Sequence, residues 1–142
     1  MIFLVGITIA SRDLEQFCSF TESVRVKSGA WDTNNRIFVY TTLNHIKYCL
    51  INGDTGIIRT LDVPVYITRV QNNQLFSLDR ECKMRTISID TTEATFKIAL
   101  EDKRYHEAMR IIHHSRLCGK AIIGYLQDKG FPEVSYYSFL YI

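Results

Sequence analysis

Two adjacent histidines and a glutamate are the first side chains whose types and spacing suggest chemistry. His113 and His114 lie in a stretch with helical periodicity, and Glu107 precedes them by about one and a half helical turns. Imidazole and carboxylate groups bind zinc, but the sequence has no HExxH arrangement and no nearby cysteine pair to complete such a site. We therefore favour a solvated helix surface, and we predict no metal or other cofactor.

A second candidate is the carboxylate of Asp54, because Asp54-Thr55-Gly56 has the form of an aspartic-protease motif. Those enzymes need two such carboxylates that share one proton, and the motif occurs once in this sequence. Gly53 before it favours a hairpin turn instead. His45 lies in an alternating strand pattern, without a serine elbow, a P-loop or a dinucleotide fingerprint. We therefore predict structural roles here, no catalytic residues and no enzyme.

The cysteines are the remaining chemically reactive side chains. Cys18, Cys49, Cys82 and Cys118 are roughly thirty residues apart, so no two are close enough in sequence for a zinc knuckle or a redox dithiol. We predict buried free thiols. The apolar segment Met1 to Ile9 lacks a basic n-region and is shorter than the ~20 residues of a membrane span, which favours a buried strand. A signal peptide is the alternative, and the cysteines would then lie in an oxidising compartment.

Composition and charge indicate a globular protein. Hydrophobic residues make up 46% and charged residues 23% of the 142 residues, which excludes a disordered or collagen-like chain. The 17 basic and 15 acidic residues are interspersed and leave a formal net charge of +2. This charge is too small to argue for a nucleic-acid partner, and we expect no small-molecule substrate.

The elements that position these residues are first strands and then helices. From Met1 to Asp90, short segments rich in β-branched and aromatic residues alternate with Asn, Asp and Gly turns, which predicts antiparallel sheets. The expected strands are Ile2 to Ala10, Leu14 to Phe20, Val24 to Trp31, Ile37 to Thr42, His45 to Ile51, Gly56 to Leu61, Val65 to Val70, Leu75 to Leu78 and Met84 to Ile89.

The pattern becomes helical after Asp90. Asp90 to Glu93 offers an N-cap side chain and an acidic first turn, and apolar residues recur at helical spacing from Phe96 to Ile112. After a break near Ser115 to Gly119, another amphipathic segment follows. We expect it to end at Lys129-Gly130, because glycine is common just after a helix C-terminus.

Several segments, taken in order and at matching spacing, carry a resemblance to a known family. They are Val24 to Asp32, Tyr40 to Thr42, Asn44 to Tyr48, Gly56 to Asp62, Leu78 to Cys82, Ile89 to Glu93, Phe96-Lys97 with Ala99-Leu100, Ala121 to Gln127 and Lys129 to Val134. The sequence resembles the coatomer alpha-subunit family over about Gly6 to Val134. The resemblance implies the end of a second β-propeller that continues into an α-solenoid.

The resemblance thus implies a multidomain fragment with a β part followed by an α part. Residues 1–90 would be partial WD-repeat propeller blades, and residues 91–142 the start of the solenoid, with an atypical tail at 135–142. A blade is a four-stranded sheet of ~40 residues, so about two blades are expected. Only three strands are expected between Asp62 and Asp90, and a propeller often supplies such a missing strand from its own N-terminal end.

Candidate structural or partner-contacting residues follow from the same family setting. Trp31 and Asp32 resemble the tryptophan-aspartate pair of propeller blades, with the indole between sheets and the carboxylate in a turn network. Arg59 lies within one of the matching segments. The charge-dense sequence at Asp79, Arg80 and Glu81 is expected either to face a partner subunit or to form a solvated hairpin tip.

The function implied by the resemblance is that of a scaffold in the COPI coat, which carries vesicles between the Golgi and the endoplasmic reticulum. The expected partners are other coatomer subunits, chiefly beta-prime, and the membrane is expected to be reached only indirectly, through the coat. The expected location is the cytoplasm, on Golgi membranes and coated vesicles.

Two alternatives remain at this point. A stand-alone propeller-type peptide-binding module would need a closed ring, which about two blades cannot form unless copies associate. A truncated, non-functional gene fragment would expose sheet edges and apolar faces and would aggregate.

Overall fold

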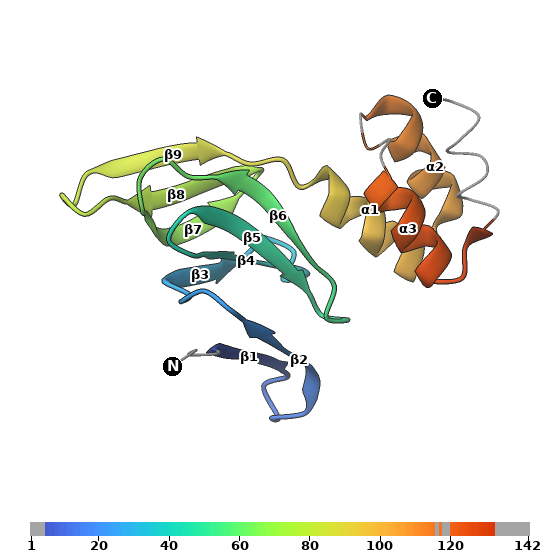
Figure 1. Ribbon diagram of the computed structural model, residues 1–142, viewed down its shortest axis with the longest axis horizontal. Coiled ribbons are helices and arrows are strands. Elements are labelled where there is room, and N and C mark those ends of the chain that lie inside the picture. Colours follow the sequence, from blue (N-terminus) through green and yellow to red (C-terminus); the bar gives the residue numbers. More distant parts are fainter. Residues whose placement is uncertain (1–4, 116, 118–119, 133–142) are drawn as a thin grey trace. The chain divides into compact units, whose positions relative to one another are not determined.

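The computed structural model describes residues 5–115, 117 and 120–132, which fall into two compact units. The first unit runs to Thr91 and the second begins at Thr92; their described residues form nine β-strands and three α-helices, respectively (Figure 1). The predicted fold class, strands followed by helices, is confirmed. The tail at 135–142 and Cys118 lie outside the described residues.

The nine strands form three antiparallel sheets in which neighbours along the chain pair with each other. The first sheet has two strands, the second has four and the third has three. Each predicted strand has an observed counterpart. Their bounds are β1 Val5–Ala10, β2 Gln16–Glu22, β3 Ser28–Trp31, β4 Ile37–Thr41, β5 His45–Leu50, β6 Thr55–Thr60, β7 Tyr66–Gln71, β8 Gln74–Leu78 and β9 Met84–Ser88.

The largest difference in bounds concerns β2 and β3. Pairing with β1 continues as far as Glu22, because Val5 and Glu22 are cross-strand partners. The predicted strand that began at Val24 begins instead at Ser28. Lys27 already donates a backbone hydrogen bond of 2.8 Å to Thr41, so the approach to β3 is fixed without strand pairing at its start.

Asparagine and glycine residues in the left-handed region close the hairpins, as their positions in the sequence predicted. Asn35 has a φ of 54° in the β3–β4 turn, and Gly53 has a φ of 92° in the β5–β6 turn. In that second turn, the Asn52 side-chain amide donates a 2.9 Å hydrogen bond to the Asp54 carboxylate. Asp54 therefore belongs to the hairpin turn, as predicted, and Thr55 and Gly56 are the first residues of β6.

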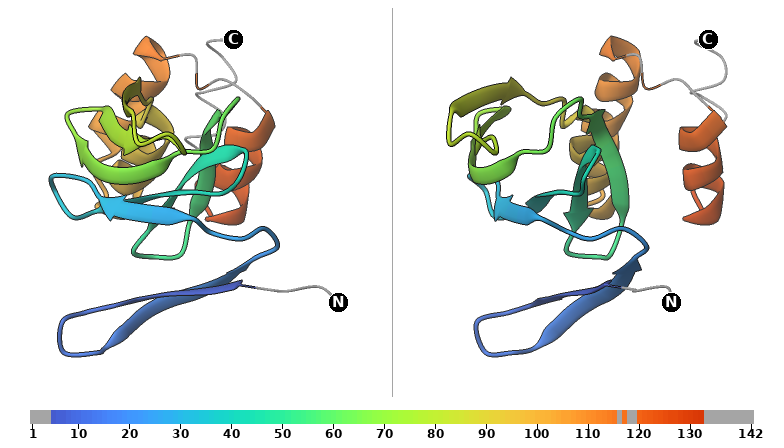
Figure 2. Two further views of the ribbon diagram at one scale, coloured as in Figure 1. Left: turned by 90° about the vertical axis from the view of Figure 1, so that its left-hand side faces the viewer. Right: turned by 60° about the vertical axis from the view of Figure 1, so that its left-hand side comes forward.

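The β1–β2 hairpin packs on the four-stranded sheet through a small apolar core. Ile9, Tyr40 and Cys49 are buried there, and the Phe20 ring lies 6.2 Å from the Tyr40 ring between centroids. Figure 2 shows the hairpin as a layer of its own. Since an isolated two-stranded hairpin is marginally stable in water, this contact contributes much of its stability.

A chain of hydroxyl groups joins the second sheet to the third. The Ser28 and Thr41 hydroxyls lie 2.8 Å apart across β3 and β4. The backbone N–H of Ile67 donates to the Ser28 hydroxyl at 2.8 Å, and the Thr41 hydroxyl donates to the Val65 carbonyl at 3.2 Å. These bonds place β7 beside β3, so the first strands of the two sheets lie together and β9 lies at the far side of its sheet.

The helical unit consists of α1 Thr92–Glu101, α2 Tyr105–His114 and α3 Lys120–Asp128. Lys103, with a φ of 59°, lies in the turn that follows α1. Gly130, with a φ of 79°, follows α3 at the predicted position. No helix in the described part of the chain is long and apolar enough to cross a membrane. The buried core of this unit comprises Phe96, Ala99, Leu100, Ala108, Ile112, Ile122 and Leu126.

Candidate functional site

The candidate site is the outer edge of β9, the last strand of the three-stranded sheet. Among the strands that the structure describes, β9 pairs with β8 alone, whereas the corresponding strand β5 of the second sheet is covered by β6. Unpaired backbone groups on a sheet edge are a template for a further strand. The sequence predicted three strands between Asp62 and Asp90, and the structure confirms this number. Because the sheet has no fourth described strand, the outer edge of β9 is uncovered.

The register of the β8–β9 hairpin shows which backbone groups of β9 face outward. Asp79 donates to Lys83 at 3.1 Å and Ile89 donates to Asn73 at 2.9 Å, so these two pairs are hydrogen-bonded pairs of the ladder. Because hydrogen-bonded and non-hydrogen-bonded pairs alternate in an antiparallel ladder, the intervening residues can be assigned. The N–H and C=O groups that point away from β8 belong to Met84, Thr86 and Ser88.

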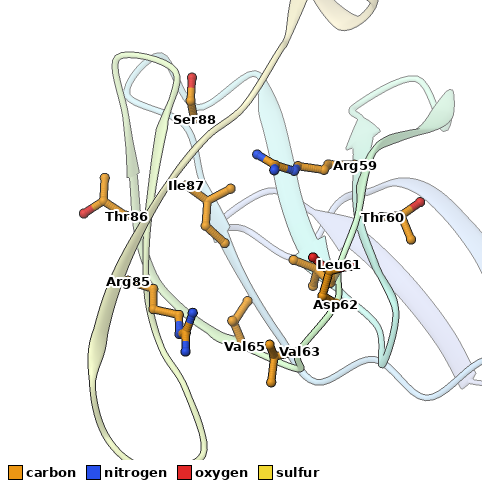
Figure 3. Close-up of a pocket in the computed structure, with 10 residues that line it drawn as sticks. All are labelled: Arg59, Thr60, Leu61, Asp62, Val63, Val65, Arg85, Thr86, Ile87 and Ser88. Atoms are coloured by element: carbon orange, nitrogen blue, oxygen red, sulfur yellow. The ribbon is translucent and has the colours of Figure 1, made fainter.

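A pocket of about 370 Å³ lies alongside this edge, between β9 and the end of β6. Figure 3 shows Arg59 on β6 and Ile87 on β9 extending into the space between the two strands. The pocket combines apolar surface with two guanidinium groups, those of Arg59 and Arg85, and one carboxylate, that of Asp62. The other lining residues are Thr60, Leu61, Val63, Val65, Thr86 and Ser88.

Arg59 is the one sequence-predicted candidate that lies in this pocket and is exposed. It is in β6 and pairs in register with Ile46 of β5. The register shifts between Ile46 and Lys47, so a bulge lies at this point of the ladder. A bulge changes the direction in which nearby side chains point. This explains why the Arg59 side chain, near the end of β6, is directed towards β9.

Asp79 organises the β8–β9 hairpin tip from a buried position. One carboxylate oxygen accepts hydrogen bonds from the backbone N–H groups of Glu81 at 2.9 Å and Lys83 at 3.0 Å, and the other contacts Arg85 Nε at 2.9 Å. The Lys83 backbone N–H and then the Arg85 guanidinium hold the pKa of Asp79 below its ordinary value. Its role is therefore to hold the turn.

Arg80 and Glu81 differ from Asp79 in that both are exposed at the tip. Glu81 forms an ion pair of 3.1 Å with Lys83, and both of these side chains are more than 70% exposed. Such surface pairs contribute little to stability. Of the three charged residues at this tip, Asp79 is buried and holds the turn, whereas Arg80 and Glu81 are solvated.

The Trp31-Asp32 pair lies at the end of β3, the first strand of the four-stranded sheet. Asp32 joins a turn network, because its carboxylate accepts hydrogen bonds from the backbone N–H groups of Arg36 at 2.8 Å and Ile37 at 2.9 Å. The indole of Trp31 is 37% exposed and lies 5.2 Å from the Phe38 ring between centroids. Phe38 is also the cross-strand partner of Trp31, and the packing of this indole between sheets stays a prediction.

An ion-pair network at Glu22, Tyr40 and Lys47 was not identified from the sequence. The Glu22 carboxylate accepts a hydrogen bond from the Tyr40 hydroxyl at 2.8 Å and pairs with Lys47 Nζ at 2.8 Å. Burial raises the pKa of Glu22, but hydrogen bonds from Lys47 and Tyr40 outweigh it, so the net pKa is lowered. Burial, and then the neighbouring Glu22 charge, raises the pKa of Tyr40. Tyr40 and Lys47 are cross-strand partners, which the predicted hairpin implies, whereas Glu22 comes from another sheet.

The histidines and the glutamate that were candidates for metal binding or catalysis belong to elements other than β9. His113 and His114 are exposed at the C-terminal end of α2, as the favoured interpretation predicted, and Glu107 pairs with Arg104. Among the described residues, no three His, Cys, Asp or Glu side chains cluster in a way that could hold a metal ion. His45 is half-buried at the start of β5, where its backbone N–H donates to the Thr42 hydroxyl at 3.2 Å.

The predicted burial of the cysteines is only partly correct. Cys49 is buried and Cys18 is half-buried, but Cys82 is exposed. Cys82 lies in the β8–β9 tip with a φ of 60°, so its side chain is carried on a tight turn away from any core. All three are free thiols.

Comparison with known proteins places the strand unit in a family. The match to the family described as COPA/B second beta-propeller covers residues 4–79, which is more than half of the chain. The matched segment contains the first two sheets and the β7–β8 hairpin of the third.

Curated relatives show the same similarity over a longer stretch. The chain is 60% identical over 129 residues to coatomer subunit alpha-2 of Arabidopsis thaliana, which covers 91% of this chain. It is 51% identical over 131 residues to coatomer subunit alpha of Dictyostelium discoideum, and 46% identical over 129 residues to coatomer subunit alpha of Saccharomyces cerevisiae. The chain spans only 10 to 11% of the length of these relatives.

Proposed function

This chain belongs to the COPA/B second beta-propeller family, and we propose that it serves as a non-enzymatic structural part of the COPI vesicle coat. The observation that carries this proposal is the 60% identity over 129 residues to a coatomer alpha subunit. In this role the sheets act as a rigid block and the helices as the first part of a solenoid, with residues 90–92 between them.

The proposal extends to partners and location. We expect the chain to assemble with other coatomer subunits, chiefly beta-prime, in the cytoplasm and on Golgi-derived vesicles. The membrane is reached through the coat rather than by the chain itself, and transport between the Golgi and the endoplasmic reticulum is the process served. The names of the relatives, which are all coatomer alpha subunits, support this assignment.

At the β9 edge, the proposal is that an extended segment of the coat adds as a fourth strand. It would pair with the outward backbone groups of Met84, Thr86 and Ser88 and would lie against the pocket beside Arg59. Main-chain hydrogen bonds provide affinity in such strand addition, while pockets for alternate side chains provide specificity. The third sheet would then match the four-stranded sheet beside it.

The coat assignment is tested by affinity purification. The tagged chain is expressed in eukaryotic cells, and the purified material is probed by immunoblot for beta-prime and for the other coatomer subunits. We expect these subunits in the eluate and Golgi-associated fluorescence of a tagged chain. An eluate that contains none of them, from a chain that is soluble and folded, would contradict the proposal.

The strand-addition step is tested by Thr86→Pro with Thr86→Val as its matched control. Proline at this position removes an outward N–H group and leaves the β8–β9 ladder intact, whereas valine keeps the N–H group and the β-branched shape. We expect Thr86→Pro to lose copurification of coatomer subunits, with circular dichroism unchanged, and Thr86→Val to retain it. Equal recovery with both variants would exclude pairing at this edge.

The exposed charges of the β8–β9 tip are proposed as a further partner contact. Arg80→Glu changes the tip charge without touching the bonds of Asp79, so folding should be preserved. Arg12→Glu, at the exposed turn between β1 and β2, makes the same charge change elsewhere and is the control. We expect weaker copurification with Arg80→Glu only, and an equal effect of both variants would remove the tip from the interface.

A further inference from the structure

Two of the free thiols, remote in sequence, converge on one carbonyl oxygen. The Cys18 Sγ atom on β2 lies 3.8 Å from the Leu50 oxygen, and the Cys49 Sγ atom on β5 lies 3.2 Å from the same oxygen. Cys18 is also close enough to Cys49 to raise the pKa of the Cys49 thiol, after the larger effect of burial. The β5–β6 turn confines this site, because a Cβ atom at Gly53 would lie 3.4 Å from the Cys18 Cβ atom.

We propose that Cys18 and Cys49 form an oxidation site, at which a peroxide converts the two thiols to a disulfide that joins β2 to β5. The bond would link the β1–β2 hairpin covalently to the four-stranded sheet on which it packs. This inference does not depend on the proposed coat function, since it rests on contacts within the strand unit alone.

The difference in exposure between the two thiols sets the order of the steps. Cys18 is half-buried and is the thiol that a peroxide reaches first, whereas Cys49 is fully buried. The Cys18 thiolate attacks one peroxide oxygen, the O–O bond breaks, and the departing hydroxide takes up a proton as water, which leaves a sulfenic acid on Cys18. The Cys49 thiol then attacks the Cys18 sulfur, the S–O bond breaks, and the departing hydroxide takes up the Cys49 proton and leaves as a second water.

The reaction is balanced, because two thiols and one hydrogen peroxide give one disulfide and two waters. The two electrons that reduce the peroxide come from the two sulfurs. Burial, and then the neighbouring Cys18 thiol, raises the pKa of Cys49 to about 12, so Cys49 is protonated while Cys18 is reduced. Burial persists after Cys18 is oxidised, so Cys49 attacks as a thiol that gives up its proton during the step.

Peptide mapping of the full chain tests this directly. The reduced protein is treated with hydrogen peroxide, blocked with N-ethylmaleimide and digested with trypsin without reductant. Cleavage at Arg and Lys places Cys18 in the peptide 13–25 and Cys49 in the peptide 48–59. We expect these two peptides to be joined by a bond that dithiothreitol cleaves, together with a loss of two thiols by Ellman titration in Cys82→Ser.

Variants distinguish this site from general thiol oxidation. Cys82→Ser removes the exposed thiol and should leave the joined peptides unchanged, whereas Cys49→Ser should abolish them and let dimedone label the sulfenic acid on Cys18. Wild-type Cys82 reports that the peroxide dose was sufficient. If Cys82 is oxidised while Cys18 and Cys49 are both recovered as separate maleimide adducts, the proposal is wrong.

Discussion

The Tyr40 hydroxyl donates a 2.8 Å hydrogen bond to the Glu22 carboxylate and so connects the second sheet to the end of the β1–β2 hairpin. Tyr40 is fully buried, and its ring also contacts Phe20 and Phe38. Lys47, the cross-strand partner of Tyr40, completes the site by pairing with the same carboxylate at 2.8 Å. A buried carboxylate without these partners would be costly, so the three residues stabilise the packing of the two sheets as a unit.

Tyr40→Phe keeps the ring contacts and removes only the donor, so it isolates the hydrogen bond. We expect a loss of about 1 to 3 kcal/mol in the free energy of unfolding at neutral pH, measured by urea denaturation. Phe38→Leu, which leaves the carboxylate and its partners in place, serves to separate ring packing from hydrogen bonding. An unchanged unfolding midpoint in Tyr40→Phe would mean that solvent replaces the hydroxyl.

The same variant gives an alkaline prediction whose sign follows from the raised pKa of Tyr40. A group whose folded pKa lies above its unfolded value of ~10 contributes stability below that value and loses it as pH rises. The wild-type protein should therefore lose stability above about pH 10 more steeply than Tyr40→Phe. Thermal unfolding from pH 8 to 11 measures the difference, and parallel profiles would contradict it.

Glu22→Gln tests the acidic side of the network. The lowered pKa of Glu22 means that its contribution is present above the unfolded value of ~4.3 and is lost as pH falls through the folded value. We expect Glu22→Gln to cost about 1 to 3 kcal/mol at pH 7, because Lys47 loses its charged partner. The gap between variant and wild type should close below about pH 4. A gap that persists at pH 3 would point to a packing defect instead.

Local patterns were sufficient to predict the strands and the switch to helices. Alternating β-branched residues separated by Asn, Asp and Gly located all nine strands, and Gly130 located the end of α3. The break between α1 and α2 was not identified, because Lys103 adopts a φ of 59° where the sequence has neither glycine nor proline. Sequence propensity cannot show that the backbone N–H of Arg104 donates a 2.8 Å hydrogen bond to the backbone carbonyl of Ala99 at this turn.

The candidate site was predictable only in part, because local sequence patterns do not report contacts between residues that are distant in the chain. The missing fourth strand followed from counting strands. The structure places Arg59 beside that strand's edge and gives Asp32 and Asp79 turn-holding hydrogen bonds, none of which the sequence specified. Contacts between sheets were not predictable, because Glu22 meets Tyr40, and Cys18 meets Cys49, across separations of 18 and 31 residues. No repeating pattern in one sequence reports such packing.

Asp79→Asn is expected to loosen the β8–β9 tip. The neutral amide accepts more weakly from the Glu81 and Lys83 backbone N–H groups and loses the charge of the Arg85 pair. Amide hydrogen exchange at residues 81 and 83 should accelerate, and the melting temperature should fall. Because the pKa of Asp79 is lowered, this difference from wild type should vanish as the pH falls through that pKa. Glu81→Gln, which removes only an exposed ion pair, should change neither measurement appreciably.

Gly56→Ala is expected to disturb the contact between β5 and β6, because Gly56 lies under the ring of its cross-strand partner Tyr48. A Cβ atom there would approach Tyr48 Cε1 to 2.4 Å, and Tyr48 is only 1% exposed, so the ring has little room to move. Overpacking of this kind costs about 1 to 3 kcal/mol. Gly6→Ala is the matched control, since no atom lies within 4 Å of its added methyl group, and it should be neutral or stabilising by up to ~1 kcal/mol. Equal unfolding free energies for the two variants, measured in urea, would show that the Tyr48 ring can shift at no cost.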